Sequence, residues 1–578
     1  MINQEIAKIF HQLALFLEME GVAFKPFAYE KAALTLETLT EDIETIYKKE
    51  GLIGLKKIPG VGESIAEKIE EYLKTGKIKY FEQYKKKYPV NIEELTAVEG
   101  IGPKLVKALW ENLKIKNLDD LEKAAKNQKI RKLPHFGEKT EKNILQGIAF
   151  LKREKGRFLL GDILPKVQEI INNLKSLKEI KHISEAGSVR RRKETIGDVD
   201  ILATLKKPSE AEKVINFFVK LGGVEKIWAQ GPTKASIRLK AGFDVDLRVV
   251  PEKSYGAALQ YFTGSKEHNI VLRKIAIDQG LKLNEYGLFK GKKMIAGKTE
   301  EEIYEKLGMK WMEPELRENT GEIEAALKKE LPEIITLQDI KGDLHVHSDW
   351  DGGANSLEEI VEAVNKMGYE YVGIADHTKF LKIEHGLDEK QLLARNKEID
   401  KLNYKLKNKN YKLKVLKGCE ANIMPDGSID IKDETLKELD YVIAGIHSTF
   451  KMSKDQMTKR IITAMKNPNV DIISHPTGRI IQRRDEYQVD FEKILKAARE
   501  TNTILEINAY PERLDIKDVY IKQAKEAGVK MIINTDAHHI DQLRFMKYGV
   551  FQARRGWAEK KDIINVWPLE KLQKQLKQ

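Results

Sequence analysis

The C-terminal part of the chain alternates short apolar segments with helical ones, and the apolar segments run into histidines or carboxylates. From residue 341 onward these segments read YVGIADH, LKVLKGCE, YVIAGIHS, VDIISHP, TILEINA and KMIINTDAH. Alternating strands and helices predict a β/α barrel or a wound sheet, in which the carboxyl ends of the strands form one face. Side chains remote in the sequence are therefore expected to meet at that face.

The side chains expected there are the ligand types of a transition-metal site. They are His345, His347, His377, Glu420, His447, His475, Asp536 and His538, with Asp376 beside them. A single histidine at a strand end is usually structural, but a series of them with carboxylates favours metal binding. Imidazole and carboxylate suit Zn²⁺ or Mn²⁺, and the missing thiolates argue against a structural zinc knot.

Composition sets broad limits on the class of protein. A chain of 578 residues, 41% hydrophobic and 33% charged, predicts several folded domains and excludes a disordered chain. The net charge of +12 fits a polyanionic partner such as nucleic acid without proving one. The single cysteine indicates a reducing compartment, and no apolar run approaches the roughly 20 residues that span a bilayer. We expect a cytoplasmic monomer with no membrane partner.

The first 150 residues show helical periodicity, no convincing strand, and two related glycine turns. Gly60 and Gly62 end the segment LKKIPGVG, whereas Gly100 and Gly102 end LTAVEGIG, and each segment precedes a helical pattern. Such a turn directs backbone N–H groups outward at a helix start, which is a seat for phosphate. One copy could simply join two packed helices. Two copies with matching flanks resemble helix-hairpin-helix motifs and favour contact with the DNA backbone.

The middle of the chain carries a potential carboxylate cluster. Asp198 and Asp200 lie two apart on a predicted strand and so face the same side, and Asp246 lies on a second predicted strand. Adjacent carboxylates stay ionised together only with a cation between them. Three carboxylates around two Mg²⁺ ions are what nucleotidyl transfer requires. A lone Asp-x-Asp is a weak signal, but the preceding Gly187-Ser188 turn could hold a triphosphate.

These motifs resemble those of the bacterial and archaeal family X DNA polymerases, the group of DNA polymerase beta. The resemblance rests on GSVRRRKETIGDVD, VDLR, YFTGS and LKKIPGVGESIAEKIEEYLKTGK, and it covers about residues 1–316. It implies that Asp198, Asp200 and Asp246 hold the two metal ions. It further implies that the triphosphate is contacted by Gly187, Ser188, Arg191 and Gly197. The nucleotide pocket would be shaped by Tyr261, Phe262, Gly264 and Asn269, and Arg273 would lie on the template side. Lys68 falls at the lyase nucleophile position, although most helical lysines are only surface charges.

The histidine-rich part resembles the PHP (polymerase and histidinol phosphatase) domain over about residues 339–575. That resemblance implies one ion held by His345, His347, Glu420 and Asp536, a second by Glu420, His447 and His475, and a third by His377 and His538. Such a cluster would activate water to attack a phosphodiester, with Arg479 as a potential phosphate contact. The family usually reads W-S-D-G where this chain has Trp350-Asp351-Gly352-Gly353, so the aspartate stands one place early. Either Asp351 swings in as a ligand, which we favour, or the third ion is weakly held.

The expected fold is multidomain: an all-α helix-hairpin-helix region, an α+β nucleotidyltransferase palm with a thumb, and a distorted β/α barrel. The boundaries we expect are 1–85 (lyase-like), 86–155 (fingers-like), 156–255 (palm), 256–316 (thumb), 317–338 (linker) and 339–578 (PHP). We expect a DNA polymerase that fills short repair gaps from dNTPs, with 3′–5′ exonuclease and abasic-site endonuclease chemistry in the PHP domain. The alternatives are a catalytically silent PHP scaffold, a phosphomonoesterase, and a DNA-binding protein without activity.

Overall fold

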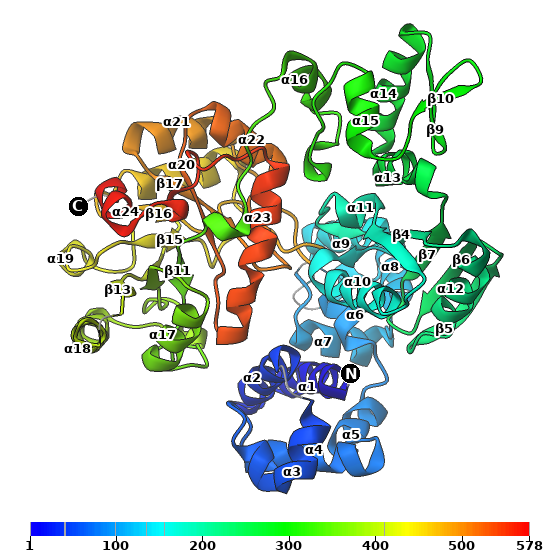
Figure 1. Ribbon diagram of the computed structural model, residues 1–578. Helices are drawn as coiled ribbons and strands as arrows, with labels where there is room; N and C mark the ends of the chain where they lie inside the picture. The colour runs from blue at the N-terminus through cyan, green and yellow to red at the C-terminus, as the bar shows by residue number, and fades with distance from the viewer. Residues whose placement is uncertain are drawn as a thin grey trace.

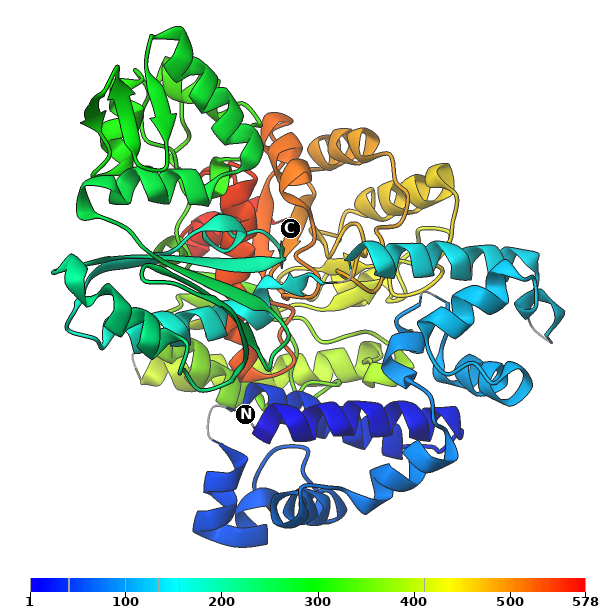
Figure 2. The same ribbon diagram turned by 90° about the vertical axis from the view of Figure 1, so that its right-hand side faces the viewer.

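The computed structural model describes residues 2–39, 42–98, 100–133, 136–154, 156–409 and 411–576. A helical region, a palm, a thumb and a barrel follow one another along the chain. Figures 1 and 2 show the thumb and the helical region at opposite ends of the molecule, with the palm between them. Figure 1 also shows the barrel side by side with the palm, at the left of the view. The predicted fold class is confirmed.

The helical region is built around one continuous apolar core that extends from Ile6 to Ile148. Its helices are α1 (Ile2–Met19), α2 (Lys25–Thr38), α3 (Ile43–Lys56), α4 (Glu63–Thr75), α5 (Lys79–Lys87), α6 (Ile92–Thr96), α7 (Pro103–Leu113), α8 (Leu118–Lys126) and α9 (Glu138–Glu154). Helix α1 is amphipathic, and its buried face packs against both α2 and α7. The core therefore crosses the boundary predicted between residues 85 and 86.

The palm is a mixed five-stranded sheet in the order β2-β4-β7-β6-β5, in which β4 and β7 are parallel. Its elements are β1 (Phe158–Leu159), α10 (Leu160–Lys175), β2 (Ile180–Glu185), α11 (Gly187–Arg190), β3 (Thr195–Ile196), β4 (Asp198–Leu205), α12 (Ala211–Phe218), β5 (Val224–Gln230), β6 (Lys234–Leu239) and β7 (Asp244–Val249). Alternation along β7 buries Val245 and Leu247 in the palm core. It thereby directs Asp244 and Asp246 to the opposite face.

The thumb combines helices with a small antiparallel sheet in the order β10-β9-β8. Its elements are α13 (Tyr255–Thr263), α14 (Lys266–Asp278), β8 (Lys282–Asn284), β9 (Gly287–Lys290), β10 (Lys293–Ala296), α15 (Glu300–Lys306) and α16 (Glu322–Lys328). Helix α16 lies in the segment predicted as a linker, yet Ile323 and Ala326 belong to the thumb core. Arg317 is also buried there, with Nη1 2.6 Å from Glu300 Oε1. The first part of that segment therefore packs as thumb.

The barrel consists of parallel strands wrapped by helices, and its ring closes through a bridge between Val346 and Ala537. Its strands are β11 (Gly342–Val346), β12 (Tyr371–Ile374), β13 (Lys414–Lys417), β14 (Glu420–Asn422), β15 (Ile443–Gly445), β16 (Ile472–Ile473), β17 (Ile504–Asn508) and β18 (Met531–Asn534). Its helices are α17 (Leu357–Lys366), α18 (Glu389–Asn408), α19 (Asp433–Leu436), α20 (Lys454–Met465), α21 (Phe491–Thr501), α22 (Asp518–Glu526), α23 (Met546–Arg555) and α24 (Leu569–Gln575). Because the strands are parallel, their carboxyl ends share one rim.

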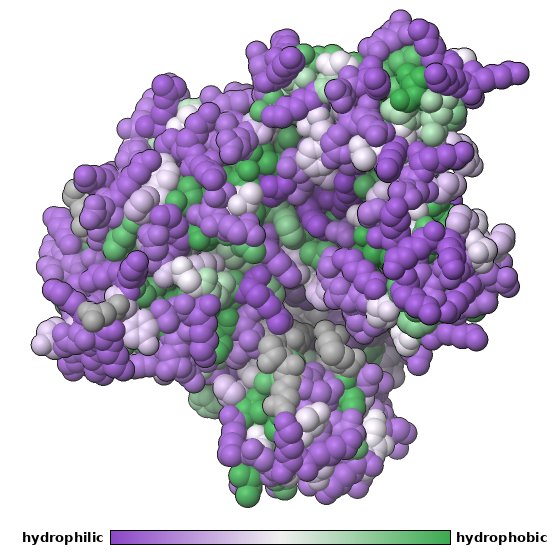
Figure 3. All heavy atoms as spheres, in the orientation of Figure 1, coloured by the Kyte–Doolittle hydropathy of each residue, from purple (hydrophilic) through white to green (hydrophobic). Residues whose placement is uncertain are grey.

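Palm and barrel share an apolar interface reinforced by ion pairs. Leu514 and Tyr548 of the barrel belong to the palm core. Across the same interface, Arg479 of the barrel lies 2.7 Å from Glu194 of the palm. Figure 3 shows a mainly hydrophilic surface, hollowed between the barrel and the thumb. Among the helices described, none is long and apolar enough to cross a membrane.

Candidate active sites

Glu420, the first residue of β14, lies at the centre of the histidine cluster in the barrel. Its Oε1 atom lies 2.9 Å from His475 Nε2 and 3.3 Å from His447 Nε2. Its Oε2 atom lies 2.9 Å from His377 Nδ1 and 3.4 Å from His345 Nε2. Burial opposes ionisation, but the facing imidazoles of His447 and His345 hold the pKa of Glu420 well below its usual value. Its two oxygens face different sets of imidazoles, as those of a carboxylate bridging two ions would.

Asp536 follows β18 and closes the other side of the cluster. Its Oδ1 atom lies 3.4 Å from His347 Nε2 and 3.6 Å from His345 Nε2. His538 stacks on His347 with ring centroids 4.0 Å apart. Ligand atoms of His347, His377 and His538 lie within 4.8 Å of one another, as do those of His345, His347 and Asp536. The strand ends therefore bring together all the histidines singled out in the sequence.

Several buried atoms of this cluster have no hydrogen-bond partner within the described part of the chain. They are His345 Nε2, His347 Nε2, His377 Nδ1, His475 Nδ1 and Glu420 Oε2. Burying unpaired polar atoms is costly. The nitrogens of His345, His347 and His377 lie 2.9 to 4.0 Å from Glu420 Oε2, and this convergence fits the donor set of a bound metal ion. Nitrogen from imidazole combined with carboxylate oxygen is the set that Zn²⁺ and Mn²⁺ accept.

The outward nitrogens of three histidines have fixed partners. His345 Nδ1 lies 2.6 Å from Glu506 Oε1, His347 Nδ1 lies 2.7 Å from Asp351 Oδ2, and His447 Nδ1 lies 2.7 Å from Asn422 Oδ1. Partners of this kind set the orientation and tautomer of the ring, which leaves Nε2 directed into the cluster.

Asp351, the displaced aspartate, is buried against the cluster. Its Oδ2 atom accepts a hydrogen bond of 2.8 Å from the backbone N–H of His377. Its Oδ1 atom accepts one of 2.9 Å from the N–H of Gly353. Gly353 must lack a side chain because a Cβ there would collide with the backbone of Ser348. Asp351 thus reaches the cluster at the Nδ1 edge of His347.

Two charged residues near the cluster are committed to other partners. Asp376 pairs with buried Arg395 at 2.9 Å and accepts a hydrogen bond of 2.6 Å from Ser348 N. Arg479 donates to both carboxylate oxygens of Glu194, at 3.2 and 2.7 Å. Its guanidinium is therefore occupied at the palm interface, and the predicted phosphate contact at Arg479 does not fit this geometry.

In the palm, Asp200 on β4 pairs in register with Asp246 on β7, and Asp198 stands two residues before Asp200. Burial and the neighbouring charges of Asp198 and Asp246 raise the pKa of Asp200 to about 6. This repulsion indicates carboxylates close enough to need a cation. Asp246 meanwhile accepts a hydrogen bond from Ser236 Oγ, and its Oδ2 lies 3.2 Å from Lys234 Nζ.

The predicted triphosphate turn lies beside these carboxylates. Gly187 has a φ of 60°, and a Cβ there would lie 3.0 Å from Asp200 Oδ2. The preceding N–H, of Ala186, donates to Asp200 O at 2.8 Å and fastens the turn to β4. Ser188 follows in α11, and Gly197 directly precedes β4. The glycines thus allow the turn to approach the strand that carries the carboxylates.

Arg191 is held between palm and thumb. Its Nε atom donates to Glu318 Oε1 at 3.0 Å, and its Nη1 atom donates to the carbonyl of Thr263. Gly264 has a φ of 71°, and a Cβ there would lie 3.1 Å from Arg191 Nη1. Glu318 also pairs with Arg555 of the barrel, at 3.1 Å. A triphosphate would therefore compete with Glu318 for this guanidinium.

The remaining predicted pocket residues lie on α13 and α14. Asn269 accepts a hydrogen bond of 2.6 Å from Gln260 and donates one of 2.7 Å to Tyr261 O. The rings of Tyr261 and Phe262 meet edge to face at 5.1 Å. Arg273 Nε donates to Asn269 O at 3.1 Å. These contacts fix the junction of the two helices on which the nucleotide pocket was predicted.

The two glycine turns of the helical region have the same geometry. Gly60 and Gly100 have φ values of 76° and 86°, which only glycine adopts readily. Gly62 and Gly102 cap α4 and α7, and a Cβ at either would meet nothing within 4 Å. The backbone at both helix starts is therefore open to an approaching phosphate.

Lys68 on α4 is half-buried between aromatic rings. Its Nζ atom donates to Ser64 Oγ at 2.9 Å and lies 5.4 Å from the ring centroid of Tyr80 and 5.8 Å from that of Tyr29. Burial, with the nearby charge of Lys25, lowers the pKa of Lys68. A lowered amine pKa favours the neutral, nucleophilic form.

Sequence reasoning missed several polar residues around the barrel cluster. Glu506 and Asn508 lie on β17, where Glu506 Oε2 accepts from His475 N at 2.8 Å and Asn508 Nδ2 donates to Asp536 Oδ2 at 3.0 Å. Both stand in the segment TILEINA, whose strand-end acid could have been found by the rule that found Glu420. Asn422 and Arg513 carry no comparable signal in the sequence.

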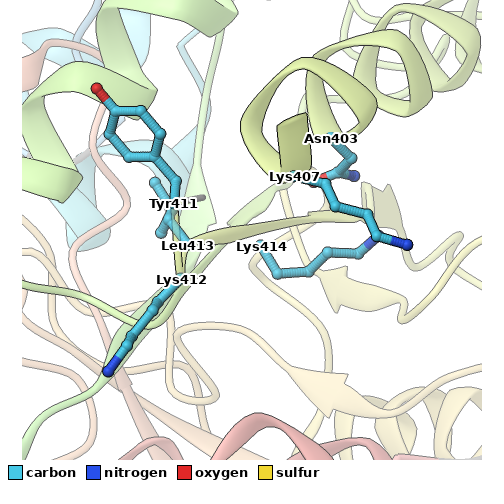
Figure 4. A pocket seen from close by; sticks show the side chains of 6 residues that line it. All are labelled: Asn403, Lys407, Tyr411, Lys412, Leu413 and Lys414. Carbon is cyan, nitrogen blue, oxygen red and sulfur yellow. The ribbon is translucent and has the colours of Figure 1, made fainter. Parts of the chain in front are cut away.

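A surface hollow lies elsewhere, where α18 leads into β13. It is lined by Asn403, Lys407, Tyr411, Lys412, Leu413 and Lys414. Figure 4 shows Lys412 and Tyr411 pointing away from Lys407 and Lys414. The Asn403 amide is bonded to the backbone of Val415 at 2.9 Å in both directions. The hollow therefore has no convergent polar groups and is unrelated to either cluster.

Comparisons with protein families match four segments of the chain. Residues 1–78 match a helix-hairpin-helix domain, 92–149 a SAM-like helix-hairpin-helix tandem, 258–318 the DNA polymerase beta thumb, and 343–510 the PHP domain. The matches follow the chain in the same order as the helical region, the thumb and the barrel.

Comparisons with individual proteins include a relative over the full length. The chain is 37% identical over 582 residues to the "DNA polymerase/3'-5' exonuclease PolX" of Bacillus subtilis, with 100% of each protein covered. It is also 41% identical over 136 residues to a "Probable phosphatase" of Thermoanaerobacter, covering 22% of this chain and 53% of that protein. A "Probable phosphatase" of Clostridium acetobutylicum is 31% identical over 206 residues, covering 34% and 78%. Full-length identity and matching domains together show that the chain belongs to the family X DNA polymerases that carry a PHP domain.

Proposed function

We propose that the protein is a DNA-directed DNA polymerase with a metal-dependent 3′–5′ exonuclease in its barrel. The observation that carries the proposal is that one chain combines a carboxylate cluster in the palm, a histidine and carboxylate cluster in the barrel, and hairpins suited to bind the DNA backbone. The full-length relationship to a protein named polymerase and exonuclease supports both activities. The substrates we propose are primer–template or gapped DNA and dNTPs, and the state we propose is a cytoplasmic monomer.

For the polymerase, Asp198, Asp200 and Asp246 would hold two Mg²⁺ ions. When bound, the ions stabilise charge on the phosphorus being transferred. The turn at Gly187 and Ser188 would orient the triphosphate, and Arg191 would bind it after leaving Glu318. The helix junction at Asn269 would shape the pocket for sugar and base.

Primer extension on a gapped duplex with Mg²⁺ tests the polymerase. Asp198→Ala should abolish extension while leaving DNA binding intact, because the hairpins lie in another part of the chain. Extension by the Asp198→Ala protein at the wild-type rate would refute the assignment. Wild-type extension on gapped but not on long single-stranded templates would support a role in repair.

For the exonuclease, the cluster around Glu420 would hold two or three Zn²⁺ or Mn²⁺ ions. When bound, such ions supply an activated water for phosphodiester hydrolysis. Glu506, Asp351 and Asn422 would orient the imidazoles of His345, His347 and His447 through Nδ1. We propose that Asp351 is also the carboxylate ligand of the third ion. The unpaired buried nitrogens argue against a catalytically silent scaffold.

Digestion of a 3′ end with Mn²⁺ tests the exonuclease, and His345→Ala should abolish it. Persistence of digestion in His345→Ala would place the nuclease elsewhere. Relatives named as phosphatases favour a second candidate, a phosphomonoesterase activity of the barrel. Comparing sugar phosphates, 3′-phosphorylated DNA and 3′-hydroxyl DNA as substrates separates the two.

We also propose abasic-site chemistry, as endonuclease in the barrel and as lyase at Lys68. The half-buried amine with its lowered pKa supports a Schiff base with an abasic sugar. Borohydride trapping of abasic DNA tests it. Wild-type protein should be trapped and Lys68→Ala should not, whereas equal trapping of both would exclude Lys68 as the nucleophile.

A further inference from the structure

Arg513 lies in a tight turn directly after β17, at the rim of the barrel that holds the histidine cluster. Its Nε atom lies 3.7 Å from Asp536 Oδ2, and its side chain is 23% exposed. Among the residues that the structure describes, its guanidinium makes no hydrogen bond. An arginine at the edge of a cluster of this kind with unused donors is suited to bind an anionic group there.

The carboxylate of Asp536 separates Arg513 from the histidines. Oδ1 faces His345 and His347, whereas Oδ2 accepts from Asn508 at 3.0 Å and faces Arg513. A group bound at the histidine cluster would therefore have Arg513 at its edge without direct contact between arginine and ions. This arrangement keeps the positive charge close to the site but outside its ligand set.

The backbone of the turn that carries Arg513 is held in place by hydrogen bonds and packing, although the guanidinium donates no hydrogen bond within the described residues. Arg513 N and Leu514 N both donate to Tyr510 O, at 2.8 and 3.0 Å. Arg479 donates to the carbonyl of Leu514, and Leu514 itself is buried in the palm core. Gly161 of the palm lacks a side chain where Pro511 packs against it. Such anchoring pre-orients a binding group at low entropic cost.

We propose that Arg513 binds the phosphodiester that is cleaved in the barrel, through a non-bridging oxygen. The inference rests on the proposed exonuclease. In that reaction water adds to phosphorus, the bond to the 3′ oxygen of the preceding nucleotide breaks, and a 5′-nucleotide leaves. The proton lost by water balances the proton gained by the 3′ oxygen through solvent. Arg513 transfers no proton and stabilises the negative charge of the phosphate.

The test compares R513A and R513K with wild type and with R483A, all as full-length protein. Arg483 is a matched control because it lies 64% exposed nearby and pairs with Glu512 at 3.2 Å. We expect R513A to lower kcat/KM for 3′ digestion roughly 10- to 100-fold, as for loss of a charge-assisted hydrogen bond. R513K should recover part of the rate, and R483A should digest like wild type.

Two further measurements separate phosphate binding from support of Asp536. Metal content should be equal in R513A and wild type, and a loss of ions in R513A would overturn the proposal. An oligonucleotide with a neutral methylphosphonate at its terminal linkage should inhibit both proteins with the same Ki. Weaker inhibition of R513A by this competitor would also overturn it, because the missing contact would then lie elsewhere on the DNA.

If wild-type protein digests no DNA, the proposed exonuclease fails but Arg513 remains testable. Inorganic phosphate titrated into the metal-loaded proteins by calorimetry should then bind wild type more tightly than R513A by the same 10- to 100-fold factor. Equal phosphate affinity would refute the assignment.

Discussion

The two clusters of the chain differ in how far they are assembled in the protein alone. In the barrel, groups of ligand atoms lie within 4.8 Å of one another, and His345 and His347 are buried. In the palm, Asp198 is exposed and Asp246 is engaged by Ser236 and Lys234. The barrel cluster is thus preformed, whereas the palm carboxylates are only partly covered, with Asp198 exposed and Asp200 and Asp246 half-buried.

The difference follows from what each site must admit. A polymerase site has to receive primer, template and nucleotide, so its carboxylates lie at the surface of a sheet. The barrel site is closed by its own strands, and hydrogen bonds behind the ligands hold them in place. We therefore expect the residues that hydrogen-bond the ligand side chains to contribute more to metal affinity in the barrel than in the palm.

The largest effects should come from ligands, and each should affect one activity only. Asp200→Ala should lower primer extension by roughly 10³-fold, since loss of metal stabilisation costs several kcal/mol. It should leave 3′ digestion unchanged, and His475→Ala should do the reverse. Steady-state kinetics of both activities in both variants checks this. Loss of both activities in either variant would show that the sites are not independent.

A smaller effect, on metal affinity, should come from the residues that hydrogen-bond the ligand side chains. Glu506→Gln keeps the shape but weakens the hold on His345, so metal affinity should fall roughly 10- to 100-fold. Ser236→Ala removes the hydroxyl that donates to Asp246. It should change the Mg²⁺ affinity of the palm less than Glu506→Gln changes the metal affinity of the barrel. Chelator titration of both variants measures the difference, with Glu512→Gln as the control because Glu512 is partly exposed and pairs with Arg483. Equal losses in palm and barrel would remove the distinction drawn above.

The ion pair between the domains should contribute modestly to stability. Arg479 is buried but Glu194 is 30% exposed. Solvent screening therefore reduces their coupling to about 1–2 kcal/mol. A double-mutant cycle with Arg479→Ala and Glu194→Ala in denaturant unfolding measures it. Strictly additive effects would mean that the apolar contacts alone join palm and barrel.

The smallest effect concerns the open palm site. Glu318→Gln should weaken the hold on Arg191 and lower KM for dNTPs roughly 2- to 5-fold, the range of a partly exposed ion pair. Glu313→Gln is the matched control, because Glu313 pairs with Arg554 at 3.4 Å and not with Arg191. A KM unchanged in Glu318→Gln would show that a triphosphate does not compete for Arg191.

The positions of the ligand-type residues could be predicted from the sequence better than those of the residues that hydrogen-bond them. Period-two spacing gave Asp198 and Asp200, and the strand-end rule gave the histidines, because both follow from backbone geometry. The orientation of a loop side chain has no such rule, so Arg479 was expected at the phosphate and lies at the palm instead. Amide partners such as Asn422 are chosen by three-dimensional packing, which leaves no spacing to detect.

The interface at Leu514 and Tyr548 has a consequence for how variation acts on this protein. Both barrel residues complete the apolar core of the palm, so the interior of the palm is incomplete without the barrel. A core substitution in the palm that leaves every nuclease ligand intact would still expose barrel surface and lower the amount of folded nuclease in a cell. Selection on either activity therefore acts on the cellular amount of both activities, because the palm and the barrel fold or are degraded together.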